Sequence, residues 1–160
     1  MWPAAGVGKS TVYLRWQDKD TLLTDAVRSH SGDIGGVDTG TLYGDLHQLA
    51  VNLFRYFREP AGWAALRVLV DAAGAPQRLG RFVEMVSDMH RGFIDEIAGR
   101  ALARGEMPAD VPARAIGECV YGSVTMQTLA ARLDGRAFDD ADIEERATVL
   151  VDVVLKGVAS

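Results

Sequence analysis

Apolar side chains recur along most of this chain at intervals of three and four residues, the spacing that places them on one face of an α-helix. The pattern predicts helices over 19–30, 42–58, 63–73, 77–103, 113–133 and 139–158. No segment alternates apolar and polar residues with the period of two that is typical of a half-buried strand. The chain is therefore predicted to be all-α.

Two breaks interrupt this helical pattern. Residues 31–40, SGDIGGVDTG, are rich in glycine and turn-forming residues and predict a linker between a head, residues 1–30, and a body, residues 41–160. Within the body, RGEMPADVP at 104–112 separates two long helices. With 160 residues, the chain is long enough for one domain or for one domain with a small appendage.

The composition is that of a soluble globular protein, with 48% hydrophobic and 24% charged residues. No apolar run reaches the roughly 18 residues of a membrane-spanning helix, and the first residues do not resemble a signal peptide. The single cysteine, Cys119, fits a reducing compartment and is interpreted as a small buried side chain. We expect a cytoplasmic protein without a membrane partner.

The net charge of −5 argues against nucleic acid as a partner, but the charge is unevenly distributed. Residues 1–30 carry four basic and three acidic side chains, and the remaining residues carry 13 basic and 19 acidic ones. A weakly basic head on an acidic body would present only the head to DNA. Charge alone does not decide whether this chain binds nucleic acid.

The head contains GKST at residues 8–11, which is also the end of a phosphate-binding loop. Such a loop requires a glycine at position 3 and a preceding buried strand. This chain has Pro3 there, and proline neither donates an N–H nor adopts other φ values. A nucleotide-dependent enzyme is therefore the least favoured interpretation.

The longer stretch AAGVGKSTVYLRWQDKDTLL, residues 4–23, resembles the end of the helix-turn-helix of the tetracycline-repressor (TetR) family of bacterial transcription regulators. The family pattern is matched at Ala5, Gly6, Val7, Lys9, Thr11, Tyr13, Trp16, Lys19 and Leu22. The segments DTGTLYGDL, RGEMPADVP and LVDVVLKGVA are similar, more loosely, to one subtype of the family's body. The resemblance implies a DNA-binding repressor with a partial helix-turn-helix head and a helical bundle that binds a ligand and dimerises.

The chemistry of the head agrees with this resemblance. Gly6 permits the tight turn between two helices, and a short recognition helix would begin near Gly8. Trp16 is interpreted as a packing residue. Ammonium and hydroxyl groups of this helix can reach base edges and phosphates, and Lys19 at the start of the next helix can reach the DNA backbone. The candidate DNA-binding residues are Lys9, Ser10, Thr11, Tyr13 and Lys19.

The head also departs from the family pattern. Gly8 replaces the usual Ser or Thr, at a small cost in helix capping. Family members carry a first helix and most of a second helix before the recognition helix, and residues 1–30 lack them. Because so short a helix is unstable alone, we expect this chain to bind operator DNA weakly or not at all unless those helices are present. The head is interpreted as the remnant of a DNA-binding domain.

By the resemblance, the body would enclose a small-molecule effector among its helices. Aromatic and methionine side chains suit an apolar or amphipathic ligand, although the same spacing is typical of an ordinary core. The candidate pocket residues are Phe54, Phe57, Trp63, Leu66, Phe82, Met85, Met89, Phe93, Tyr121 and Met126. His90 and Tyr121 are candidate polar contacts, and His90 is equally interpretable as a histidine of the surface or core edge.

The last two predicted helices are expected to form a homodimer. Gly122 and Ser123 would allow close approach of another helix, and residues 139–158 have a wide apolar stripe. With their two-fold mates these helices would form a four-helix bundle, as the family resemblance implies. The predicted seam includes Val120, Val124, Leu150 and Val154.

The sequence offers no support for catalysis or metal binding. The three histidines have neither HxxxH nor HxxE spacing, and no Ser-His-Asp arrangement stands out. We expect no enzymatic activity and no cofactor. Beside the repressor, one alternative stays open, a helical small-molecule-binding or interaction module without a role on DNA.

Overall fold

The computed structural model describes residues 19–31, 34–74, 77 and 79–158. Its helices are α2 (Lys19–His30), α3 (Leu42–Arg58), α4 (Pro60–Ala73), α5 (Gly80–Ala103), α6 (Ala113–Leu133) and α7 (Asp140–Val158). No strand occurs within these described ranges, so the predicted all-α class is confirmed. No helix among them has the length and apolarity needed to cross a bilayer.

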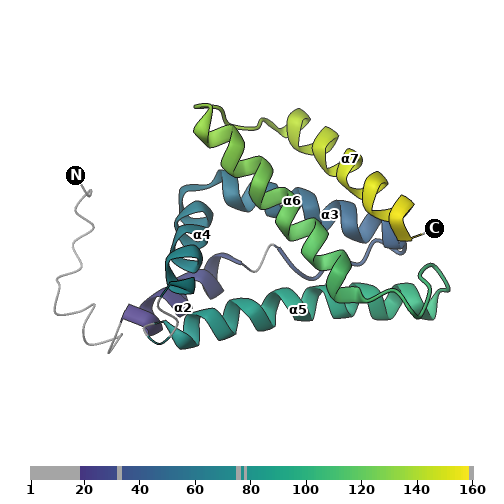
Figure 1. Ribbon diagram of the computed structural model, residues 1–160, viewed down its shortest axis with the longest axis horizontal. Coiled ribbons are helices and arrows are strands. Elements are labelled where there is room, and N and C mark those ends of the chain that lie inside the picture. Colours follow the sequence, from purple (N-terminus) through teal and green to yellow (C-terminus); the bar gives the residue numbers. More distant parts are fainter. Residues whose placement is uncertain (1–18, 32–33, 75–76, 78, 159–160) are drawn as a thin grey trace.

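Helix α3 connects the two ends of the molecule (Figure 1). It packs against α4, α5, α6 and α7, whereas α2 contacts α4 and α5. Helix α6 packs against both α5 and α7. One end of the molecule is therefore formed by α3, α6 and α7, and the other by α2, α4 and the first half of α5.

Most buried apolar side chains belong to one cluster, the main core, which lies among α3, α5, α6 and α7. Leu46, Leu49, Val124 and Val151 are completely buried there. A second cluster, the small cluster, consists of Val27, Phe82 and Val86 with partly buried neighbours from α2, α4 and α5. Apolar burial is thus concentrated at the α3–α6–α7 end.

Local signals in the sequence set the helix ends. Thr41 Oγ1 accepts a hydrogen bond from Gly44 N at 3.0 Å and caps α3. Asp139 and Asp142 cap α7 reciprocally, each carboxylate accepting from the other residue's N–H, at 2.8 and 3.1 Å. Gly105, with φ of 71°, provides the left-handed residue that ends α5.

The segments DTGTLYGDL and RGEMPADVP meet at the N-terminus of α3. Asp45, which is fully buried, accepts hydrogen bonds from Thr39 N at 2.7 Å and Thr39 Oγ1 at 2.8 Å. It also pairs with Arg100 at 3.2 Å and Arg104 at 3.6 Å, and Arg104 pairs with Glu106 at 2.8 Å. Burial by itself raises the pKa of Asp45, but these hydrogen bonds and Arg100 outweigh it and hold the pKa below its usual value.

Candidate ligand-binding cavity

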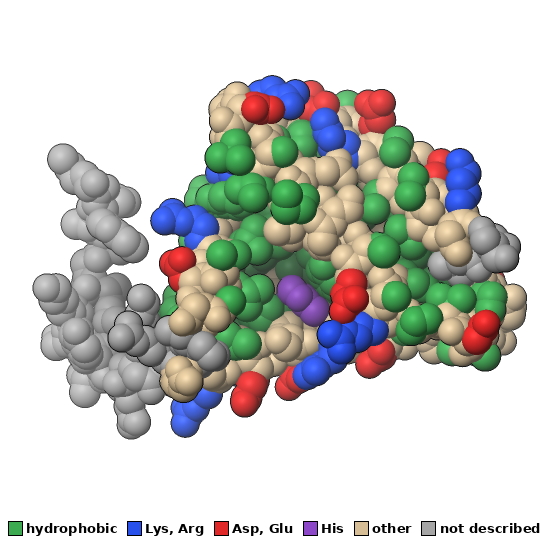
Figure 2. Space-filling view, in the orientation of Figure 1, with side chains coloured by type: hydrophobic (Ala, Val, Ile, Leu, Met, Phe, Trp, Pro, Cys, Tyr) green, Lys and Arg blue, Asp and Glu red, His purple; other side chains and the backbone are tan. Residues whose placement is uncertain are grey.

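A cavity of about 400 Å³ lies among α2, α3, α4, α5 and α6. Its volume falls within the roughly 300–1,000 Å³ of small-molecule sites. On the surface, Figure 2 shows a recess among hydrophobic side chains with a histidine at its rim. The lining residues are Val27, Ile34, Leu53, Tyr56, Phe57, Ala65, Leu66, Leu69, Phe82, Val86, Met89, His90, Tyr121, Gly122, Thr125 and Met126.

Helix α4 creates this space because it turns away from α3. One residue, Glu59, ends α3 and precedes α4, so the chain makes a corner there (Figure 1). At Gly62 a Cβ would lie 1.9 Å from the Tyr56 carbonyl oxygen, so only glycine permits this close approach. Although α4 is strongly apolar, its fully buried residues are Gly62 and Ala72. Ala65, Leu66 and Leu69 of α4 line the cavity.

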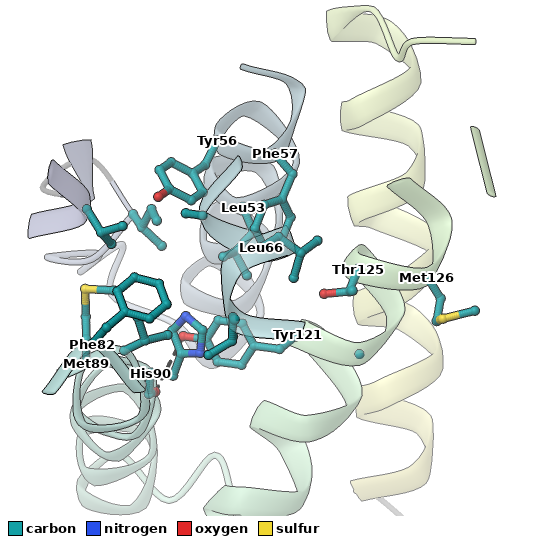
Figure 3. A pocket seen from close by; sticks show the side chains of 16 residues that line it. Leu53, Tyr56, Phe57, Leu66, Phe82, Met89, His90, Tyr121, Thr125 and Met126 are labelled. Carbon is teal, nitrogen blue, oxygen red and sulfur yellow. Dashed lines mark hydrogen bonds between the residues drawn. The ribbon is translucent and has the colours of Figure 1, made fainter. Parts of the chain in front are cut away.

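The cavity wall is almost entirely apolar. None of the described lining residues is Asp, Glu, Lys or Arg, and its polar side chains are those of Tyr56, His90, Tyr121 and Thr125. The His90 ring stacks on the Tyr121 ring, with centroids 4.3 Å apart and planes 19° apart (Figure 3). The Tyr121 hydroxyl makes a long hydrogen bond of 3.5 Å to the His90 carbonyl oxygen.

Burial keeps these polar groups uncharged near neutral pH. It lowers the pKa of His90 to about 4 and raises the pKa of both Tyr121 and Tyr56. A neutral imidazole offers one donor and one acceptor. The cavity can therefore contribute a few hydrogen bonds to a ligand but no ionic contact.

Helix α2 contributes a residue to the cavity wall and caps the start of α5. Its Val27 is a lining residue. Its Asp20 carboxylate accepts hydrogen bonds from Arg81 N at 3.0 Å and Phe82 N at 2.8 Å. These are N–H groups of the first turn of α5, whose N-cap residue Leu79 makes no side-chain cap. Asp20 thus caps α5 from a different helix and holds Phe82, itself a lining residue.

Comparison with known proteins identifies the family. Residues 37–154 match the family described as "Tetracyclin repressor-like, C-terminal domain", which covers most of the chain. The chain belongs to the TetR family of transcription regulators.

Two relatives illustrate the likeness. The HTH-type transcriptional regulator AqdR of Rhodococcus erythropolis is 28% identical over 120 residues, which make up 70% of this chain and 54% of AqdR. This chain thus spans about half the length of that relative. The crystal structure of the TetR family transcription regulator SCO0332 superimposes with a TM-score of 0.66 at 24% identity, over 92% of this chain and 80% of that chain. That likeness shows the shared fold.

The predicted pocket residues of this TetR-family body fall into two groups. Those that line the cavity are Phe57, Leu66, Phe82, Met89, Tyr121 and Met126. The others pack elsewhere. Phe54 lies in the main core with its ring edge-on to Phe138, at 5.7 Å. Trp63 lies under the Arg132 guanidinium, 4.4 Å from the ring centroid.

Met85 and Phe93 also lie outside the cavity lining. Met85 packs against the small cluster. Phe93 packs on the main core and against Gly35, where a Cβ would overlap the Phe93 ring. Helical spacing selects residues that face the interior, but a helix with several neighbours has more than one interior face.

Sequence reasoning missed several lining residues. Val27 lies at helical spacing from Leu23 in the predicted 19–30 helix, a pattern that indicates an apolar face but not what that face contacts. Ile34 belongs to the predicted linker, yet it is 2% exposed and packs in the main core. Tyr56 and Thr125 carry no distinct signal, because isolated polar residues on an apolar helix are common.

The predicted dimer seam requires a correction. Val120 and Val124 are completely buried, Leu150 is 8% exposed, and Val154 packs against the main core. Val120, Val124 and Leu150 therefore pack in the interior of the chain, and Val154 is partly buried. The large apolar side chains of α6 and α7 that are exposed are Met126, Leu133, Val149 and Val153, each more than half exposed.

Three further expectations concern the head, Cys119 and metals. Lys9, Ser10, Thr11 and Tyr13 lie outside the described residues, and α2 begins at Lys19, whose side chain is also not described. Their roles on DNA stay predictions. Cys119 is exposed on α6, which corrects its interpretation as a buried side chain. Within the described ranges, no three His, Cys, Asp or Glu residues form a group that could hold a metal ion.

Proposed function

We propose that this chain is a TetR-type repressor whose helical body, residues 41–160, binds a small apolar or amphipathic molecule and dimerises. In this proposal residues 1–30 contribute to DNA binding and 31–40 link the two parts. The observation that carries the proposal is the cavity, because its wall includes Val27 of α2. That helix directly follows the stretch that resembles a recognition helix.

Ligand binding would be transmitted through α2 and α5. A molecule in the cavity contacts Val27 and Phe82, and the Asp20 carboxylate holds the Phe82 N–H. A displacement of α5 would therefore move α2 and the head with it. For this to release DNA, the ligand must bind more tightly to the arrangement that does not fit the operator.

The exposed apolar side chains of α6 and α7 support dimerisation. Val149 and Val153 lie one turn apart on α7, and Met126 and Leu133 lie two turns apart on α6. A second copy related by a two-fold axis would cover both rows and complete a four-helix bundle. The dimer seam proposed for this chain therefore uses these side chains in place of the buried ones.

A cavity-filling substitution tests ligand sensing before the ligand is known. Ala65→Phe places a ring in the cavity, and Ala64→Phe places the same ring at the neighbouring exposed position. An operator would first be selected from random-sequence duplex DNA on the protein carrying the two helices that the family resemblance places before the recognition helix, and each variant would carry them too. Fluorescence anisotropy would then give the affinity of each protein for that operator.

We expect A65F to weaken operator binding by about tenfold, within the usual range of allosteric coupling, and A64F to leave it unchanged. Melting temperatures of both variants would verify that they fold. Equal operator affinities for all three proteins would refute ligand-controlled release. If no DNA sequence is enriched even with those two helices present, the alternative of a binding module without a role on DNA replaces the proposal.

A further inference from the structure

The charges around the cavity restrict what it can bind. Its described lining includes no acidic or basic side chain. Arg91, the residue after His90 and the nearest basic side chain along α5, is exposed and already pairs with Asp88. A carboxylate or ammonium ion inside the cavity would therefore lose water without gaining a counter-charge. This favours an uncharged ligand.

The imidazole of His90 is one of the hydrogen-bonding groups that the cavity offers, beside the hydroxyls of Tyr56, Tyr121 and Thr125. The rings of the two other histidines are engaged, since His30 Nδ1 lies 2.8 Å from the Ala26 carbonyl oxygen and His47 Nε2 lies 3.2 Å from Thr148 Oγ1. No described residue hydrogen-bonds the ring nitrogens of His90, although the ring is held in place by stacking on Tyr121. The ring points toward the cavity in Figure 3. A ligand can supply the missing partner.

The remaining wall favours a flat ring system. Tyr56, Phe57, Phe82 and Tyr121 contribute aromatic rings from three helices, and Met89 contributes a thioether. Aromatic and sulfur-containing walls pack well against planar rings. We infer that the cavity takes an uncharged, largely apolar aromatic molecule that places one carbonyl oxygen on the His90 imidazole. This inference rests on the proposed sensing function and names the class of ligand.

Three naphthalene derivatives of similar shape test the inferred class of ligand on the unaltered protein. They are 2-acetylnaphthalene, with a carbonyl, 2-ethylnaphthalene, with no polar group, and 2-naphthoate, with a carboxylate. Their ultraviolet absorbance, read in both chambers after equilibrium dialysis at neutral pH, gives the bound and free concentrations. We expect the ketone to bind about fivefold to tenfold more tightly than the hydrocarbon, the usual effect of one hydrogen bond. The carboxylate should bind at least about tenfold more weakly than the ketone.

Two matched variants assign the hydrogen bond to His90. His90→Phe keeps a ring but removes both ring nitrogens, so the ketone should bind no more tightly than the hydrocarbon, whose own affinity is retained. His47→Phe makes the same change outside the cavity and should leave both affinities unchanged. Thermal melting verifies that each variant folds. Even if one variant does not fold, the comparison of the three probes on the unaltered protein decides which class of ligand the cavity binds.

The inference is overturned if the carboxylate binds as tightly as the ketone, if the ketone binds no more tightly than the hydrocarbon, or if none of the three binds. The first two results would leave ligand sensing intact, because probes still occupy the cavity. Conversely, equal operator affinities of the A65F and A64F variants would refute ligand-controlled release without changing any probe affinity. The two proposals can therefore fail separately.

Discussion

The two ends of this molecule are built from similar apolar helices but are filled differently. Where α3, α6 and α7 meet, side chains such as Leu46, Leu49 and Val124 are completely buried. Where α2, α4 and α5 meet, a cavity of about 400 Å³ takes the place of a continuous core. We expect the filled end, formed by α3, α6 and α7, to contribute most of the stability. The hollow end, formed by α2, α4 and α5, contributes a space large enough for a small molecule.

The polar contacts follow the same division. At the filled end, Arg58 pairs with Asp140 at 2.8 Å and Arg55 with Glu144 at 3.5 Å, which joins α3 to α7. At the hollow end, the Asp20 carboxylate joins α2 to the first turn of α5. The contact between Asp20 and α5 adds to the apolar packing of Val27 and Leu23 in the small cluster.

Truncation of one leucine at each end should give the largest contrast. Leu46→Ala removes a completely buried side chain and should lower the free energy of unfolding by about 3 kcal/mol or more. Leu69→Ala enlarges a space that already exists and should cost only about 1 kcal/mol. Urea unfolding followed by circular dichroism measures both. Equal losses would show that the hollow end is packed as tightly as the filled one.

Acid should destabilise the two ends in different pH ranges. The pKa of His90, about 4, lies below its ordinary value of 6.5, so between these values the unfolded chain binds the additional proton. Stability should fall as the pH decreases through this range. The pKa of Asp45 is held below its usual 3.8, so its contribution is present above that value and is lost at lower pH.

Variants separate these two effects. His90→Phe should remove the loss between about pH 6.5 and about pH 4. Asp45→Asn should lower stability at neutral pH, because Arg100 loses its buried partner, and should weaken the further loss below about pH 3.8. Urea midpoints measured across this pH range test both. An unchanged acid profile in either variant would contradict its assignment.

The smallest expected effect concerns the cap that Asp20 provides. Asp20→Ala should cost about 1 kcal/mol, the usual value of a helix cap, and Asp20→Asn should cost less because asparagine also caps helices well. Amide hydrogen exchange would show where stability is lost. We expect faster exchange in α2 and the first turn of α5, with α3 and α7 unaffected. Uniformly faster exchange would contradict a local role.

Some features of the fold follow directly from local sequence. The predicted bounds 19–30 and 113–133 coincide with α2 and α6, and Asp139 caps α7. Helix α4 begins at Pro60, earlier than the predicted residue 63, because proline is well tolerated in the first turn of a helix. Capping and helical spacing depend on residues three or four positions apart, which a sequence displays.

The candidate site was predictable only in part. Phe82 and Met89 were expected in the pocket and line it, whereas Trp63 instead packs under Arg132. On α7, Leu150 was expected at the surface seam, yet its neighbour Val149 is the exposed one. For Trp63 and Leu150, the apolar pattern predicts that the side chain packs against something, but it does not predict which residues it packs against.

The sequence by itself determined the all-α class, the helix bounds that local signals set, and the resemblance to TetR regulators at residues 4–23. Only the tertiary structure decided which apolar helix faces are buried in the core and which line the cavity. A cavity depends on how helices far apart in the chain cross, and here the corner at Glu59 turns α4 away from α3. Hydrophobic periodicity is the same for a side chain that fills a core and for one that lines a cavity.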